Sequence, residues 1–166
     1  MINLLPVFGL VAPPILYFVF FGLNSSAFSA IGLSGDNMLI GVSIITVIVW
    51  TWSGFYAKSA NKYFAKMENS NFKKSFGVQS ISETTQLFIW LFIDTLFEID
   101  NIYIELAQIT LIIFFVGNAL RLWLTSLAFG VEIKTAANAN KFILLEETVL
   151  WGLVFLLCLM MGGVFL

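Results

Sequence analysis

The sequence predicts an all-α membrane protein, a polytopic transmembrane helix bundle of about five spans, with four as the alternative. Of its 166 residues, 60% are hydrophobic and only 11% are charged, whereas soluble domains carry about 25% charged residues. The mean hydropathy is correspondingly high, at +0.96. Apolar stretches of roughly 20 residues, the length that crosses the hydrocarbon core of a bilayer, recur along the chain. These observations indicate a single integral membrane domain over residues 1–166.

Five stretches approach the length of a span. The first contains Pro6, Pro13 and Pro14, which remove backbone donors and are expected to kink this helix or shorten its regular part. Its N-terminus lacks a basic region and a small-residue cleavage site, so we interpret it as a retained first span and not as a signal peptide. The predicted spans cover residues 3–23, 38–57, 86–106, 108–129 and 142–166.

The segment 58–85 is the only long polar stretch, and it predicts a basic loop on the cytoplasmic side, or on the matrix side in a mitochondrion. With five spans, Lys134 and Lys141 fall on the same side, which places the N-terminus inside. Three of the loop lysines are spaced by four and continue the second span as a helical stem. They indicate either an anchor for anionic headgroups or an ordinary solvated loop. The five loop lysines are Lys58, Lys62, Lys66, Lys73 and Lys74.

Ionisable residues inside predicted spans are the main candidates for a site, because each costs about 2.5 to 3.5 kcal/mol at the bilayer centre and needs a partner or water. Asp94 and Glu98 are four residues apart and therefore share a helix face. If the chain reverses near Ala107, Asp94 and Arg121 reach similar depths. Arg121 is the only arginine, and we expect it to pair with Asp94 or Glu98.

A second geometry ends the third helix at Glu98 and begins a long helix at about residue 102. Asp and Asn are typical of turns and N-caps, so the acids of this segment would then lie near the water interface. Near the start of the last span, Glu146 and Glu147 are expected to reach toward the interface, with one of them turning inward as the alternative. The candidates for a cation or proton site are Asp100, Glu105, Glu146 and Glu147.

The absence of histidine removes the commonest ligand of zinc, a common axial ligand of haem and the commonest general base. We therefore predict no metal site, no haem and no other cofactor, and the sequence assigns no catalytic residue. The net charge of -2 gives no indication of a nucleic-acid partner.

Two pairs of motifs resemble known families. "SETTQLFIWLF" at 82–92 and "FFVGNALRLWLTSLAF" at 114–129 follow the helix order of the membrane-associated eicosanoid and glutathione metabolism (MAPEG) family. This resemblance implies a trimer that binds glutathione or a lipid between subunits, with Arg121 and Glu83 as candidate contacts. "LSGDN" at 33–37 and "DTLFEIDN" at 94–101 resemble the paired motifs of TerC-type metal transporters, which would make Asp36 and Asp100 metal ligands.

Three functions follow as hypotheses. The first is a structural or accessory subunit of a larger membrane protein assembly, since an aromatic-rich chain with little mass outside the bilayer suits a surface covered by lipid and other subunits. The second is a MAPEG-like enzyme or binding protein that handles glutathione or lipid. The third is a small ion or proton transporter. The expected partners are membrane lipids and either other membrane subunits or further copies of the chain, in a bacterial or organelle inner membrane.

Overall fold

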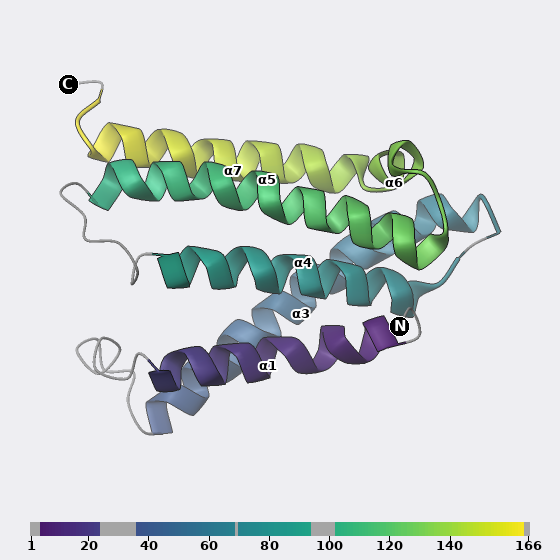
Figure 1. Cartoon of the computed structure of the whole chain (residues 1–166), viewed down its shortest axis with the longest axis horizontal. Helices are drawn as coiled ribbons and strands as arrows, with labels where there is room; N and C mark the ends of the chain where they lie inside the picture. The colour runs from purple at the N-terminus through teal and green to yellow at the C-terminus, as the bar shows by residue number, and fades with distance from the viewer. Residues whose placement is uncertain (1–3, 24–35, 69, 94–101, 165–166) are drawn as a thin grey trace. The chain divides into compact units, whose positions relative to one another are not determined.

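A computed structural model describes residues 4–23, 36–68, 70–93 and 102–164. Within these ranges the chain is helical and contains no strand, which confirms the all-α class (Figure 1). The chain divides into two compact units, residues 1–84 and 85–166, and helix α4 runs across the boundary. The helices are α1 Leu5–Leu23, α3 Asp36–Ala65, α4 Phe72–Ile93, α5 Ile102–Phe129, α6 Ile133–Ala139 and α7 Lys141–Met161.

Four helices of the described part, α1, α3, α5 and α7, are long and apolar enough to cross a membrane. The prediction of a membrane protein with transmembrane helices is thus confirmed. Of the predicted span 86–106, the structure describes the end of α4, to Ile93, and the start of α5, from Ile102; the residues between them lie outside the described residues, so this span stays a prediction. With 22 residues α4 is long enough to cross, but it falls below the hydropathy of the other four.

The chain does not reverse near Ala107, as one of the two predicted geometries required. Ala107 is buried within α5, and Glu105 occupies the first turn of that helix, where a carboxylate suits the positive end of the helix dipole. A long helix that begins at residue 102 is the feature that the other geometry predicted. Residues 94–101, which include Asp94, Glu98 and Asp100, lie outside the described residues.

The predicted loop 58–85 is mostly helix, which corrects the sequence interpretation. Helix α3 continues through Lys58 and Lys62, as the predicted helical stem does, whereas α4 begins at Phe72, inside the predicted loop. The polar side chains of α4 suggested a solvated loop, yet most of them are buried in protein. Hydropathy cannot distinguish these two environments. The buried polar residues of α4 are Ser75, Gln79, Ser80, Ser82, Thr84 and Gln86.

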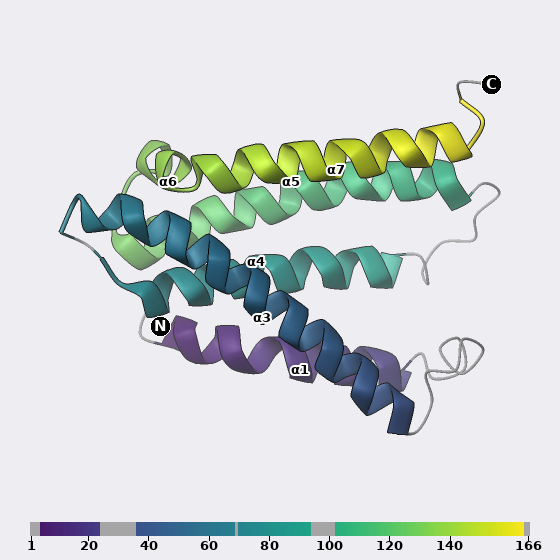
Figure 2. The same cartoon turned by 180° about the vertical axis from the view of Figure 1, so that it is seen from behind.

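In the first unit, α3 crosses α1 obliquely (Figure 2). Apart from the adjacent pair Tyr56 and Ala57, the buried positions of α3 are spaced by three and four residues, so they form one face of the helix. Hydroxyl and small side chains alternate on this face with larger apolar ones. The positions are Val42, Thr46, Val49, Ser53, Tyr56, Ala57, Ala60 and Phe64.

Helices α1 and α4 approach each other closely at two glycines. A Cβ atom added to Gly9 would lie 2.8 Å from the Cα of Gly77, and one added to Gly77 would lie 2.5 Å from the carbonyl oxygen of Leu5. Neither contact leaves room for a side chain. Small residues allow two backbones to touch in this way, which is how helices associate where no hydrophobic driving force exists between them.

The same contact repairs the backbone of α1. Pro13 lies inside this helix and has no N–H, so the carbonyl of Gly9, four residues earlier, loses its partner within the helix. The hydroxyl of Ser80, on α4, donates to that carbonyl oxygen at 2.5 Å. Because a carbonyl in hydrocarbon must be satisfied by protein, this bond replaces the donor that Pro13 removes, and α1 continues as one helix from Leu5 to Leu23.

In the second unit, α5 and α7 lie side by side and antiparallel, joined by the short helix α6 (Figure 1). Gly130 has a φ of +63°, and the N–H of Val131 donates to the carbonyl of Ser126 at 3.1 Å, which is the Schellman pattern of a helix C-terminus. Asn140, at the junction of α6 and α7, is fully buried. Its Nδ2 donates to the Thr125 hydroxyl at 3.1 Å, which fixes the start of α7 against α5.

We expect Ser80→Ala to lower the free energy of unfolding by about 1 to 3 kcal/mol, the cost of leaving a buried carbonyl unsatisfied. The loss should largely disappear in a Pro13→Ala background, because the alanine restores an N–H to the Gly9 carbonyl. Unfolding by SDS titration in bicelles measures both values.

Ser82→Ala is the matched control for this prediction. Ser82 is also buried in α4 but donates only to the Val78 carbonyl of its own helix, and its removal should cost no more than about 0.6 kcal/mol. An equal cost of Ser80→Ala with and without Pro13 would contradict the proposed repair.

Candidate functional site: a buried ion pair between two helices

The site forms on the inward face of α5. Apart from the adjacent pair Gly117 and Asn118, polar and small side chains recur there at intervals of three, four and seven residues, so the face continues along the helix. On an apolar span such side chains must point into protein. The members of this face are Thr110, Gly117, Asn118, Arg121, Thr125 and Ala128, all buried.

At the centre of the site, Arg121 of α5 pairs with Glu147 of α7. The distance from Arg121 Nη2 to Glu147 Oε1 is 2.5 Å, and the two side chains are 0% and 2% exposed. The N–H is not aligned on this oxygen, so the contact is an ion pair and not a directed hydrogen bond. Since neither charge reaches the surface, each neutralises the other inside the unit.

Two amides complete the polar cluster. Asn118, one turn before Arg121, accepts a hydrogen bond from Arg121 Nη1 at 2.7 Å and donates to the Phe114 carbonyl at 2.9 Å. Gln86 of α4 donates from Nε2 to Glu147 Oε2 at 3.1 Å. Both carboxylate oxygens of Glu147 therefore face a donor or a positive charge, as a buried carboxylate requires.

Gly117 makes the reach of Gln86 possible. A Cβ atom at position 117 would lie 2.1 Å from both Cγ and Nε2 of Gln86, so the glutamine side chain lies directly over the bare backbone of α5. The Oε1 of Gln86 is buried without a hydrogen-bond partner. This amide is therefore held by its bond to Glu147 and by its packing on Gly117.

The backbone around Arg121 is fixed as well. The Thr125 hydroxyl donates to the Arg121 carbonyl at 2.7 Å and accepts from Asn140 at 3.1 Å. Asn140 also donates to the Ala136 carbonyl at 2.9 Å. The hydrogen bonds thus connect the loop end of the unit to the ion pair.

The structure brings some predicted residues together and separates others. Arg121 has a buried acidic partner, but it is Glu147, and pairing with Asp94 or Glu98 stays untested because both lie outside the described residues. The expected position of Glu147 at the interface is wrong, since Arg121 draws it into the bundle, as the alternative foresaw. Glu146, which adjoins Glu147 in the chain, and Glu105 are both half-buried, and neither bonds to Arg121 or Glu147.

Sequence reasoning missed Gln86, Asn118, Thr125 and Asn140. Asn118 and Thr125 could have been found, because they lie three and four residues from Arg121 in an otherwise apolar span. Gln86 could not have been found, because the sequence interpretation divided α4 between the predicted loop 58–85 and the predicted span 86–106. Asn140 was missed because the junction of α6 and α7 was treated as an ordinary loop.

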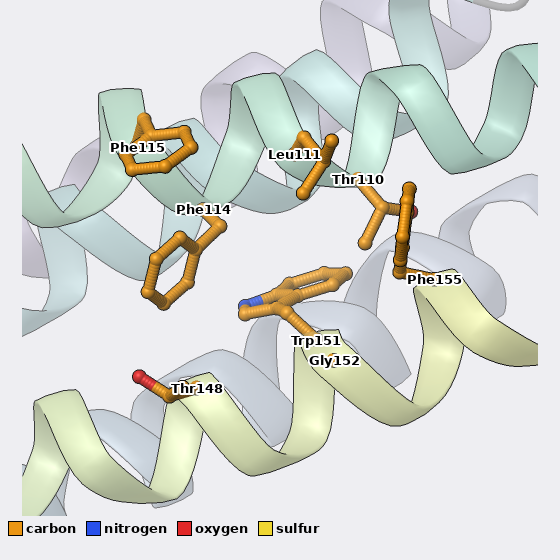
Figure 3. Close-up of a pocket in the computed structure, with 8 residues that line it drawn as sticks. All are labelled: Thr110, Leu111, Phe114, Phe115, Thr148, Trp151, Gly152 and Phe155. Atoms are coloured by element: carbon orange, nitrogen blue, oxygen red, sulfur yellow. The ribbon is translucent and has the colours of Figure 1, made fainter.

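A shallow groove lies on the outer side of the α5–α7 contact, with a volume of about 160 Å³. The indole of Trp151 lies between the two helices near Leu111 and Phe114 (Figure 3). The hydroxyl of Thr148 is bonded to the Leu144 carbonyl at 2.6 Å, so it offers little to a polar ligand. The groove is lined by Thr110, Leu111, Phe114, Phe115, Thr148, Trp151, Gly152 and Phe155.

Among the residues that the structure describes, no three His, Cys, Asp or Glu side chains come together as metal ligands would. The TerC resemblance is not tested by this, because Asp100 lies outside those residues and the side chain of Asp36 is not described. Comparison with protein-family models, curated proteins and solved structures found no match to this chain. The candidate site is thus defined by its own geometry.

We expect Arg121→Met to lower the free energy of unfolding by about 3 to 5 kcal/mol, because it leaves the Glu147 carboxylate buried without a counter-charge. Glu147→Leu should cost a similar amount. The double variant should recover most of the loss, since two apolar side chains need no partner. SDS unfolding in bicelles gives the three values, and additive losses would show that the two residues do not act as a pair.

Glu146→Gln is the control for the ion pair. This residue adjoins Glu147 but is half-buried and outside the cluster, so its substitution should change stability by less than about 0.5 kcal/mol.

Gly117→Ala should displace Gln86 and break its bond to Glu147, which we expect to cost about 1 to 3 kcal/mol. In a Gln86→Ala background the same substitution should cost little, because the overlapping side chain is gone. Gly152→Ala is the matched control: a Cβ there meets nothing within 4 Å, and the helix should gain about 0.5 to 1 kcal/mol. Equal effects at both glycines, measured by thermal unfolding in detergent, would refute the packing argument.

Proposed function

We propose that this chain is a structural or accessory subunit of a larger membrane protein assembly, in which the Arg121–Glu147 pair fixes helices and carries no chemistry. The observation that supports this function best is the complete burial of both charges, 0% and 2% exposed. A residue that binds a substrate or relays a proton needs access to it. Here Arg121 also donates to Asn118, and Glu147 also accepts from Gln86. These bonds leave fewer polar atoms of the pair for a substrate or a proton donor.

The outer surface of α7 supports the same proposal. Only 11% of its span is buried within the chain, so most of the helix must be covered by lipid or by another subunit. Exposed apolar side chains recur every four residues and form one continuous ridge. The ridge consists of Leu145, Val149, Leu153, Leu157 and Met161.

We further propose that α4 is a fifth crossing, shielded from lipid by protein. At about 1.5 Å per residue its 22 residues measure about 33 Å, enough for the hydrocarbon core. The two connecting segments 24–35 and 94–101 contain no Lys or Arg. All seven lysines would then lie near the other ends of the helices, which the positive-inside rule assigns to the N-terminal, inner side.

The burial of Arg121 weighs against the MAPEG-like alternative. Glutathione is anionic and would need an accessible cation. In this chain the candidate cation, Arg121, is buried and paired with Glu147. A proton or ion transporter would similarly need Glu147 to exchange its partner. The structural proposal requires neither.

Native mass measurement after extraction in a mild detergent tests this function. We expect a complex whose mass is not a multiple of the 18.6 kDa chain, because other subunits remain bound. The Arg121→Met/Glu147→Leu double variant should enter the same complex, since it keeps the helix contact without the charges. A homotrimer that retains glutathione, and loses it in the double variant, would contradict the proposal and favour the enzyme.

A further inference from the structure

We infer that the turn between α3 and α4 binds the headgroup of an anionic phospholipid between two groups of lysines. The groups flank one short turn: Lys58, Lys62 and Lys66 at the end of α3, and Lys73 and Lys74 at the start of α4. The inference concerns the first unit and does not depend on the ion pair or on the proposed function.

Hydrogen bonds of the described residues on either side of the turn join it to the two helices that carry the lysines. The hydroxyl of Ser70 donates to Asn61 Oδ1 of α3 at 3.2 Å. Asn71 caps α4, accepting from the Lys74 N–H at 3.2 Å. Glu68 adopts a φ of 61°, a conformation that reverses the chain and is uncommon outside glycine. Lys66 and Lys73 are therefore held at one end of the unit.

The charges of this turn are not balanced within the chain. Five lysines face one carboxylate, Glu68, over residues 58–74, and among the described residues none of the five forms an ion pair. Lys58 and Lys62 repel each other at a spacing of four. Lys73 and Lys74 lie in the first turn of α4, where the helix dipole disfavours cations. Lys62, in the last turn of α3, suits the negative end of that helix dipole. Helix stability does not explain Lys58, Lys73 and Lys74, whereas a bound anion would.

The position along α3 identifies the anion as a lipid headgroup. This helix has 30 residues and measures about 45 Å, whereas the hydrocarbon core is about 30 Å thick. Its last turns therefore reach the headgroup layer. Met67 and Phe72, beside the lysines, are 43% and 47% exposed, and such apolar side chains suit contact with the acyl region just below a phosphate. Basic clusters next to a span attract anionic lipids in this way.

Native mass spectrometry tests the inference on the full chain released from nanodiscs that contain equal amounts of phosphatidylglycerol and phosphatidylcholine. We expect preferential retention of phosphatidylglycerol, reduced roughly fivefold for each lysine removed in a Lys62→Gln/Lys66→Gln/Lys73→Gln variant. The matched control, Lys134→Gln/Lys141→Gln, removes charge from the α6 region and should retain the lipid.

Three results would overturn the inference: no preference for the anionic lipid in the unaltered chain, equal retention by the triple variant, or equal loss in the control. A separate arm distinguishes a lipid from a free anion. Phosphatidylglycerol should raise the thermal unfolding midpoint in detergent in a lysine-dependent way, and inorganic phosphate at the same concentration should not. Equal protection by phosphate would assign the lysines to a soluble anion and exclude the headgroup.

Discussion

The Arg121–Glu147 pair is the interaction on which the second unit depends. An arginine within an apolar span has no stable position in hydrocarbon unless an anion meets it, so α5 can pack only where α7 presents Glu147 at 2.5 Å. Buried pairs add little net stability over apolar contacts, because desolvation offsets their attraction. Here the pair acts through register: sliding either helix by one turn would leave two uncompensated charges. Gly117 then leaves room for Gln86, of the same unit, to donate to this carboxylate.

The first unit obeys the same constraint through its backbone. Pro13 removes a donor that the Gly9 carbonyl needs, and the hydroxyl of Ser80 replaces it at 2.5 Å. Only glycines at positions 9 and 77 let the helices approach closely enough for this bond. In both units, then, a polar group that would be costly in lipid is satisfied from a neighbouring helix, and α4 supplies the donor each time, through Ser80 and Gln86. This gives a role to two of the buried polar residues of α4, whereas Ser82 and Thr84 donate to carbonyls of their own helix.

The polar contacts between helices separate what could be predicted from the sequence from what could not. The class, the membrane helices and the need of Arg121 for a buried acid followed from hydropathy and from the cost of charge in a bilayer. The partner did not, because spacing within one helix reports a shared face and says nothing about which helix lies opposite. The extent of α4 was missed for a related reason. Hydropathy measures transfer to lipid, and it does not identify a helix whose polar side chains, such as Gln79 and Ser80, are buried in protein.

The charges of the second unit are buried and its outer helix faces are apolar, and this limits how a partner subunit or a lipid can recognise the chain. Inside the second unit, the charge of Arg121 is neutralised by that of Glu147, so the pair contributes little electrostatic potential at the outer surfaces of α5 and α7. Their outer faces are apolar, and in lipid such faces associate through shape and small residues, not through a hydrophobic force. Among the described residues, five lysines face one carboxylate around the turn at Glu68. A partner subunit would therefore pack against the shape of the α7 ridge. Anionic lipid would set the depth and orientation in the bilayer of the helices that carry the lysines.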